Sequence, residues 1–167
     1  MGPALVATSP GKRYYITFTN DKTRLTLFQL LRTKDEAFRS YKEFEAWCDT
    51  RIGKKVKMFH TDHGGEYLSN EFTSYLKSRG KEQQLTVHDT LQRNGIAERR
   101  NKTILGRVHA LLHASNLPKF LWGEAARNVV WLMNRTSTTS VEGMTPFEAT
   151  FGTKPNPSSI REWGEKI

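Results

Sequence analysis

The sequence predicts an α/β fold in which helices flank a mixed β-sheet. Two runs rich in β-branched and aromatic residues, 13–18 and 25–31, are separated by a polar turn and predict a hairpin. A helical pattern over 34–49 leads to a third strand at 56–61, and strands joined through a helix favour a parallel crossover. This order of elements, followed by further helices, is typical of an α/β domain.

The remaining elements follow from caps and periodicity. Ser69 or Asn70 can cap a short helix that ends at Gly80, before a brief strand at 83–88 and a polar loop at 89–95. Apolar residues recur at helical spacing over 96–115 and 118–135. The expected buried faces of these two helices are formed by Ala97, Ile104, Val108, Leu111 and Leu112, and by Phe120, Trp122, Val129, Val130 and Met133.

The motif TPFE at 145–148 predicts a capping box, with Thr145 as the cap, Pro146 first in the helix and Glu148 reaching back. We expect one domain over residues 1–164 and a short tail at 165–167.

The charge balance points to a polyanionic partner. Lys and Arg number 26 against 17 acids, a net charge of +9 that favours nucleic acid over an inert basic surface. The single Cys48 excludes a disulfide framework and a cysteine-based zinc site. No apolar run approaches the ~18 residues that a membrane span needs, so no membrane partner is expected. Neither a secretory nor another targeting signal is evident.

Two acids are candidates for chemistry. Asp62 follows the strand at 56–61 and precedes two glycines, and Glu98 is expected in the first turn of the helix at 96–115. Structural explanations are a turn acid for Asp62 and, for Glu98, either the helix dipole or an i,i+4 pair with Lys102. The functional explanation is a pair of metal-binding carboxylates, because Glu98 lies about 100° from the middle of the apolar face. The residues alone are compatible with both explanations.

Four blocks in order carry a family resemblance: FHTDHGGEYLSNEF, QRNGIAERRNKTI, LPKFLWGEAARNVVWLMNR and TPFEATFGTKP. Together they resemble the integrase core of copia-type LTR retrotransposons, with retroviral integrases as more distant relatives. The resemblance extends from about Gly2 to Gly164. Asp62 and Glu98 are separated by the 35 residues 63–97, which is the family's spacing between its second and third catalytic acids.

The resemblance implies a ribonuclease-H-like fold, DNA strand transfer and two Mg²⁺ (or Mn²⁺) ions. It implies that Asp62 and Glu98 bind metal, and that Lys102, Arg99, Asn94 and Gly95 lie against DNA. It also implies that the protein forms homo-oligomers on DNA. The DNA partners are retroelement ends and a target, and the protein is expected in the nucleus or cytoplasm.

One departure from the family pattern matters most. The first catalytic acid belongs to D-x-x-G-P, of which Gly2 and Pro3 match the end, so that acid would lie two positions before Met1. Most of the central first strand is then expected to lie outside residues 1–167 as well. Asp21, in the hairpin turn, is a poor substitute for the acid. Leu91 replaces the proline usual in the loop before Gln92.

The expected function is DNA integration by a metal-dependent polynucleotidyl transferase or endonuclease, impaired in this chain because the first acid is absent. The alternative is a non-catalytic nucleic-acid-binding remnant or domesticated protein. A non-integrating ribonuclease-H-type nuclease is disfavoured, because NGIAER and LPKFLW resemble integrases specifically. His60, His63 and His88 lack the clustered ligands of a zinc site.

Overall fold

A hairpin lies at the centre of the fold. The computed structural model describes residues 4–61, 69–85, 91–160 and 162–164. Strands β1 (Tyr14–Thr19) and β2 (Thr26–Leu31) pair antiparallel. The carboxamide oxygen of Asn20 accepts two backbone N–H groups in the turn between them, which fixes that turn locally. The hairpin predicted from the sequence is therefore confirmed, within one residue at each end.

One helical segment covers one face of the hairpin. A 3₁₀ turn at Lys34–Glu36 leads into α1 (Ala37–Trp47), and a π-helical turn continues to Ile52. The segment ends at Gly53, whose φ of 67° is the left-handed conformation that glycine adopts without a Cβ clash. The helix predicted over 34–49 is confirmed and extends slightly further.

A second, smaller sheet lies beyond α1. Strands β3 (Met58–Thr61) and β4 (Glu82–Leu85) pair in parallel and are connected through α2 (Asn70–Ser78). Ser69 caps α2, since its hydroxyl accepts the N–H of Phe72 at 3.2 Å.

The parallel crossover predicted from the strand at 25–31 through the helix at 34–49 to the strand at 56–61 is not found among the described residues. There β3 pairs with β4, connected through α2, and neither strand pairs with the hairpin.

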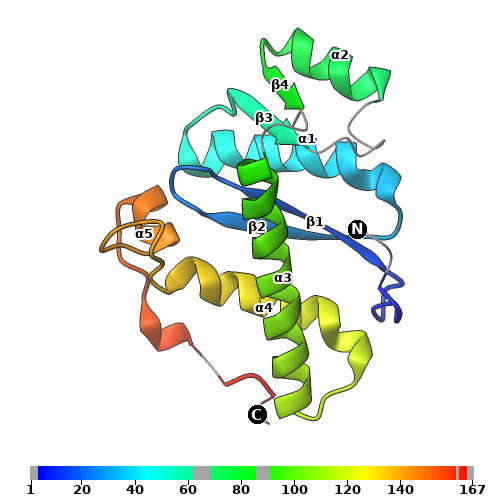
Figure 1. Cartoon of the computed structure of the whole chain (residues 1–167), viewed down its shortest axis with the longest axis vertical. Helices are drawn as coiled ribbons and strands as arrows, with labels where there is room; N and C mark the ends of the chain where they lie inside the picture. The colour runs from blue at the N-terminus through cyan, green and yellow to red at the C-terminus, as the bar shows by residue number, and fades with distance from the viewer. Residues whose placement is uncertain (1–3, 62–68, 86–90, 161, 165–167) are drawn as a thin grey trace.

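Three helices complete the fold. The long α3 (Leu91–Ala114) crosses α4 (Trp122–Arg135), and the short α5 (Pro146–Phe151) lies near the end of α4 (Figure 1). The hydroxyl of Thr145 accepts the N–H of Glu148 at 3.0 Å, which confirms the predicted cap of α5. Among the described residues, no helix has both the length and the apolar character that crossing a bilayer requires.

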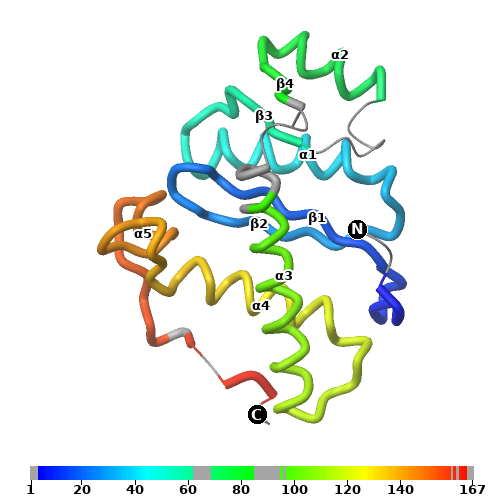
Figure 2. Tube along the Cα trace, in the orientation of Figure 1, coloured from blue at the N-terminus to red at the C-terminus, as the bar shows by residue number. Residues whose placement is uncertain are grey.

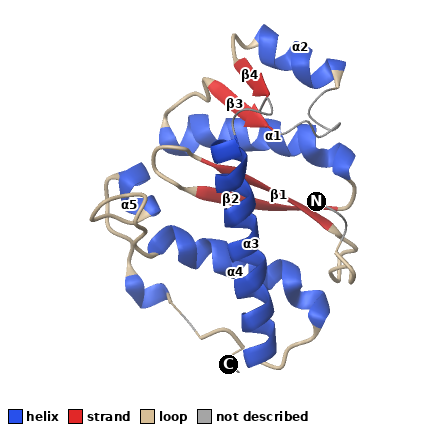
Figure 3. Ribbon diagram, in the orientation of Figure 1, coloured by secondary structure: helices blue, strands red, loops and turns tan. Residues whose placement is uncertain are grey.

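The hairpin lies between α1 and the pair of helices α3 and α4 (Figures 2 and 3), and an apolar core lies on each side of it. The first core joins β2 to α3 and α4 and contains Leu30, Ile104, Val108, Leu112, Trp122, Ala125, Ala126, Val129 and Val130. The second joins the hairpin to α1 and α2 and contains Ile16, Phe18, Leu31, Ala37, Tyr41, Phe72 and Leu76.

Two features of the helices differ from the sequence prediction. The helix begins at Leu91 rather than about 96, so residues 91–95 are helical and not loop. Gly95 lowers the helix propensity there by about 1 kcal/mol, which the rest of this long helix outweighs. Ala97 is exposed, and Phe120 is 42% exposed because it lies in a 3₁₀ turn that precedes α4, so neither belongs to a buried face.

A buried ion pair joins α1 to the connection between α2 and β4. Lys81 donates to the carboxylate of Glu45, which also accepts the Tyr75 hydroxyl at 2.8 Å, and the Lys81 and Glu45 side chains are only 5% and 9% exposed. Burial raises the pKa of Glu45, but the hydrogen bonds from Lys81 and Tyr75 and the nearby positive charges outweigh it. The net effect is a lowered pKa.

Removing one partner of this pair should destabilise the protein strongly. We expect Lys81→Met to lower the free energy of unfolding by about 3–5 kcal/mol, because it leaves a buried carboxylate without its cation. Urea unfolding near neutral pH measures the effect, and Lys77→Met, on the exposed side of α2, is the matched control. Equal losses in the two variants would contradict a special role for the pair.

The same pair predicts how stability depends on pH. Because the folded-state pKa of Glu45 is depressed, its stabilisation is present above the unfolded pKa near 4.5 and is lost as pH falls through the folded value. Glu45→Gln should therefore flatten the fall in stability below about pH 4.5. An unchanged acid limb in urea titrations would show that other carboxylates cause it.

Candidate nucleic-acid and metal site on helix α3

The buried face of α3 determines which side chains remain available. Ile104 and Val108 are almost fully buried, and Leu112 is 8% exposed, at the i, i+4, i+8 spacing of one helix face. These residues pack in the core shared with α4. The opposite face of α3 is therefore directed towards solvent.

Two polar contacts attach α3 to the hairpin and fix its rotation. The Thr17 hydroxyl of β1 donates to the Asn101 carboxamide oxygen at 3.2 Å, and the Arg100 guanidinium donates to the backbone oxygen of Arg24 at 2.7 Å. Burial lowers the pKa of Arg100, and the charges of Arg24 and Arg107 lower it further.

Arg100 and Asn101 were not predicted from the sequence as positioning residues. The run ERRNK consists of five polar or charged residues that look equivalent, and only the rotation of the folded helix distinguishes them.

Glu98 lies on the exposed part of α3. Within the described residues its carboxylate has neither an ion pair nor a hydrogen bond, although Lys102 is one turn away and also exposed. The helix-dipole explanation does not apply either, because α3 starts at Leu91 and has no acid in its first turn. The structural explanations for Glu98 are therefore not met in this structure.

The residues predicted to contact DNA lie on α3 near Glu98. Arg99 is exposed like Lys102, and the Thr103 hydroxyl bonds to the backbone oxygen of Arg99 at 2.9 Å. Asn94 and Gly95 were expected in a loop that enters the helix, but both lie within the first turns of α3. A Cβ added at Gly95 would meet only the guanidinium of Arg99, at 3.8 Å.

Asp62 lies outside the described residues. It directly follows Thr61, the buried last residue of β3, so the sequence places it at the end of that strand. The approach of Asp62 to Glu98 remains a prediction. Asp21 is engaged elsewhere, in an ion pair with Arg24 at 2.7 Å within the hairpin turn.

Among the described residues, no three His, Cys, Asp or Glu side chains are grouped closely enough to hold a metal ion. His60 is exposed on β3, while His63 and His88 lie outside the described residues. Glu98 is the member of the predicted metal pair whose surroundings can be described.

The fold defines the class of protein. The structure resembles the intasome chain in "CryoEM structure of simian T-cell lymphotropic virus intasome in complex with PP2A regulatory subunit B56 gamma", with a TM-score of 0.66 and 19% identity over 90% of this chain and 51% of that one. It also resembles the catalytic core domain of BIV integrase, with a TM-score of 0.63 and 14% identity over 88% and 90% of the two chains. The chain therefore has the ribonuclease-H-like fold of retroviral integrase catalytic cores.

The sequence relatives of the chain are Pol polyproteins of plant retrotransposons. The chain is 39% identical over 135 residues to the retrovirus-related Pol polyprotein from transposon TNT 1-94 of Nicotiana tabacum, a match that covers 81% of this chain and 10% of the relative. It is 29% identical over 152 residues to the Pol polyprotein from transposon RE1 of Arabidopsis thaliana, covering 91% and 10%. No protein-family model matches the chain.

These comparisons confirm the resemblance inferred from the sequence motifs. The relatives are Pol polyproteins of plant retrotransposons, and the structural neighbours are integrase cores. The chain spans about a tenth of the length of the curated relatives that it matches.

The anchoring of α3 can be tested by a comparison of adjacent arginines. We expect Arg100→Ala to lower the free energy of unfolding by about 1.5–3 kcal/mol, because a charged hydrogen bond to the hairpin turn is lost. Arg99→Ala, one residue earlier and exposed, should change it by no more than about 0.5 kcal/mol. Urea unfolding measures both, and similar losses would argue against an anchoring role for Arg100.

Proposed function

We propose that this chain is the catalytic core of a retrotransposon integrase that acts in DNA integration. The observation that carries the proposal is the Glu98 carboxylate, exposed and uncommitted among the described residues, on a helix of an integrase-core fold. Asp62, which follows β3 at the family's spacing from Glu98, supplies the second carboxylate.

The acids present fit divalent metal ions of the Mg²⁺ or Mn²⁺ type. Mg²⁺ prefers hard oxygen ligands and is commonly held by one or two carboxylates together with phosphate oxygens. Glu98 meets this requirement, because no described cation neutralises it and it faces solvent from which DNA can approach. Two such ions, when bound, activate the attacking oxygen and stabilise the leaving oxygen of a phosphodiester.

The protein side chains around Glu98 bind and orient DNA in this proposal. Lys102 and Arg99 are exposed cations close to Glu98 on α3, so they can neutralise phosphates next to the reacting one. Asn94 and Gly95 lie nearer the start of the same helix. Arg100 and Asn101 keep this face outward through their contacts with the hairpin.

A third carboxylate is required for the full family site, and we propose that it belongs to a strand that would pair with the second edge of β1. The backbone N–H of Ala4 donates to the oxygen of Arg13 at 2.7 Å, so the chain already runs beside the start of β1. Residues 1–167 alone are then expected to be inactive or nearly so.

An activity assay tests this proposal directly. The 167-residue chain, incubated with Mg²⁺ or Mn²⁺ and a labelled donor DNA end, should give no strand transfer above background. A variant preceded by a strand whose Asp lies two positions before Met1 should gain activity, because the set of three carboxylates is complete. In that variant Asp62→Asn and Glu98→Gln should each abolish the gain.

Glu71→Gln, on the exposed side of α2, is the charge-matched control and should leave the gained activity unchanged. Strand transfer by the 167-residue chain that Asp62→Asn abolishes would contradict the proposed inactivity. Failure of the extended variant to react would contradict the proposed metal site.

The second candidate function is non-catalytic nucleic-acid binding by a remnant or domesticated protein. The net charge of +9 and the cations of α3 favour it. Because phosphate contacts release counterions, DNA affinity should fall by roughly 10³-fold or more between 50 and 200 mM salt if about six phosphates are contacted. Fluorescence anisotropy with a labelled duplex measures the salt slope.

Variants on α3 separate general attraction from a defined surface. Lys102→Ala should weaken DNA binding and reduce the salt slope by about one unit, since one phosphate contact is lost. Lys54→Ala, exposed after α1, is the matched control. An affinity that hardly changes with salt would eliminate both DNA-binding proposals.

The same resemblance leads us to propose homo-oligomers assembled on retroelement ends and target DNA. The structural neighbours include a chain of an intasome, which supports such an assembly for this fold. Action on chromosomal DNA would require access to the nucleus.

A further inference from the structure

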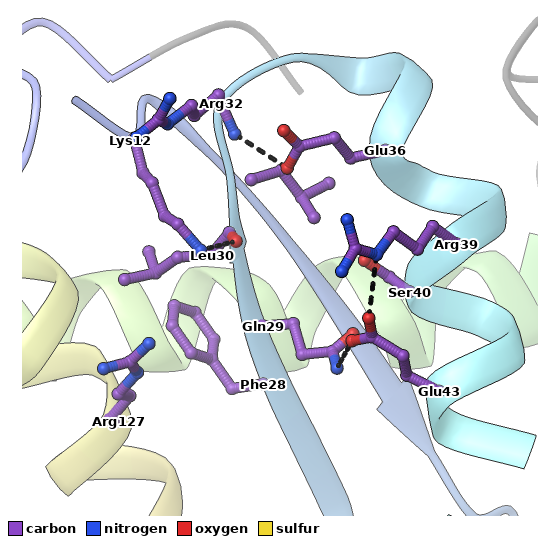
Figure 4. A pocket seen from close by; sticks show the side chains of 11 residues that line it. Lys12, Phe28, Gln29, Leu30, Arg32, Glu36, Arg39, Ser40, Glu43 and Arg127 are labelled. Atoms are coloured by element: carbon purple, nitrogen blue, oxygen red, sulfur yellow. Dashed lines mark hydrogen bonds and ion pairs between the residues drawn. The ribbon is translucent and has the colours of Figure 1, made fainter. Parts of the chain in front are cut away.

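A pocket lies along the outer edge of β2, on the side of the hairpin away from β1 (Figure 4). Its volume is ≈ 540 Å³, and its floor is formed by β2 from Phe28 to Leu31 and by Arg32, which follows the strand. The helical segment of α1 borders it on one side, through Glu36, Arg39 and Glu43, and Arg127 of α4 borders it on the other. The pocket is separate from the face of α3 that contains Glu98.

The backbone of β2 presents strand-pairing groups to this pocket. Alternate residues of an antiparallel strand direct their N–H and C=O groups to opposite edges, and Leu25 bonds towards the β1 side through its oxygen and the Asn20 N–H. Thr26, Phe28 and Leu30 therefore direct their backbone groups outward.

Some of these outward groups are already satisfied. The Asn134 side chain occupies both backbone groups of Thr26, at 2.9 and 2.7 Å, and the Lys12 ammonium donates to the oxygen of Leu30 at 2.8 Å. In the described part of the chain, the N–H and C=O of Phe28 and the N–H of Leu30 have no such partner. One donor and one acceptor on Phe28, with a second donor two residues on, match the pattern that an added strand satisfies.

The charges around the pocket favour an acidic occupant. Its two acids are engaged, because Glu36 accepts the Arg32 backbone N–H at 3.1 Å and Glu43 accepts from Arg39 at 3.0 Å and Gln29 at 3.2 Å. The guanidinium groups of Arg32 and Arg127 are exposed and have no partner among the described residues. Uncommitted positive charge therefore remains on the rim.

We propose that this pocket binds an extended acidic peptide segment, which adds as a strand to the edge of β2 and places a carboxylate against Arg127 or Arg32. A second folded copy of this chain fits less well, because α1 and α4 border the strand on both sides (Figure 4). Nucleic acid fits less well too, because its phosphates need donors only. The Phe28 carbonyl needs a donor, which a peptide N–H supplies and a phosphate does not.

Labelled synthetic peptides and the full 167-residue chain test this inference. The probe is a capped hexapeptide of alternating Val and Glu, followed by fluorescence anisotropy. We expect binding that weakens about tenfold or more when every Glu is replaced by Lys, because facing charges change from attractive to repulsive. Arg127→Glu should weaken binding of the Glu peptide and strengthen binding of the Lys peptide, whereas Arg51→Glu, an exposed reversal beyond the pocket, should change neither.

Backbone methylation distinguishes strand addition from charge attraction alone. N-methylation of alternate peptide amides should weaken binding about tenfold or more in one of the two possible patterns and only slightly in the other, because one set of amides faces β2. Bound peptide should also slow exchange of the Phe28 amide hydrogen. The proposal would be overturned if the two methylation patterns had equal effects or if the Glu peptide did not bind. It would also be overturned if a single-stranded oligonucleotide displaced the Glu peptide while exchange of the Phe28 amide hydrogen stayed unchanged.

Discussion

Packing around Tyr41 is the constraint on which the arrangement of the two sheets depends. The hairpin and the β3–β4 pair share no backbone ladder in the described residues, so side chains must set their relation. The fully buried ring of Tyr41 lies 6.3 Å from that of Phe18 on β1 and 4.6 Å from that of Phe59 on β3. Buried aromatic pairs at these spacings combine area burial with preferred ring geometry, so one residue of α1 orients strands from both sheets. Because Asp62 follows β3 in the chain, the placement of the predicted metal site begins with this apolar cluster.

Sequence patterns predicted the elements well wherever local physics dominates. The strands of the hairpin, the Ser69 and Thr145 caps and the i, i+4, i+8 face of α3 depend on neighbours within a few residues, and the structure contains all of them. The start of α3 was misplaced because Gly95 weakens the local helix signal, and tertiary context overrides such a preference.

Contacts between residues far apart in the chain could not be predicted from the sequence. Arg100 binds a carbonyl 76 positions earlier, and Asn134 binds a strand edge 108 positions earlier. Neither pairing has a periodic or motif-like signal. The family motifs selected Glu98 and Asp62, but only the fold shows that Glu98 lacks the i,i+4 partner that a helical surface usually provides.

The two edges of the hairpin differ in how far other groups cover their backbone N–H and C=O groups. This difference links the fold to its proposed roles. An exposed strand edge invites pairing with other chains, and proteins commonly block such edges with charged or polar side chains. On β2 the blocking is partial: Asn134 and Lys12 cover the two ends, and the groups of Phe28 between them stay open. At the start of β1, the short N-terminal segment bonds through the Ala4 N–H to the oxygen of Arg13, the residue before the strand. Side chains thus cover selected backbone groups of the β2 edge and leave others available. We propose a different partner for each edge: a strand that carries the third carboxylate for the edge of β1, and an acidic peptide for the edge of β2.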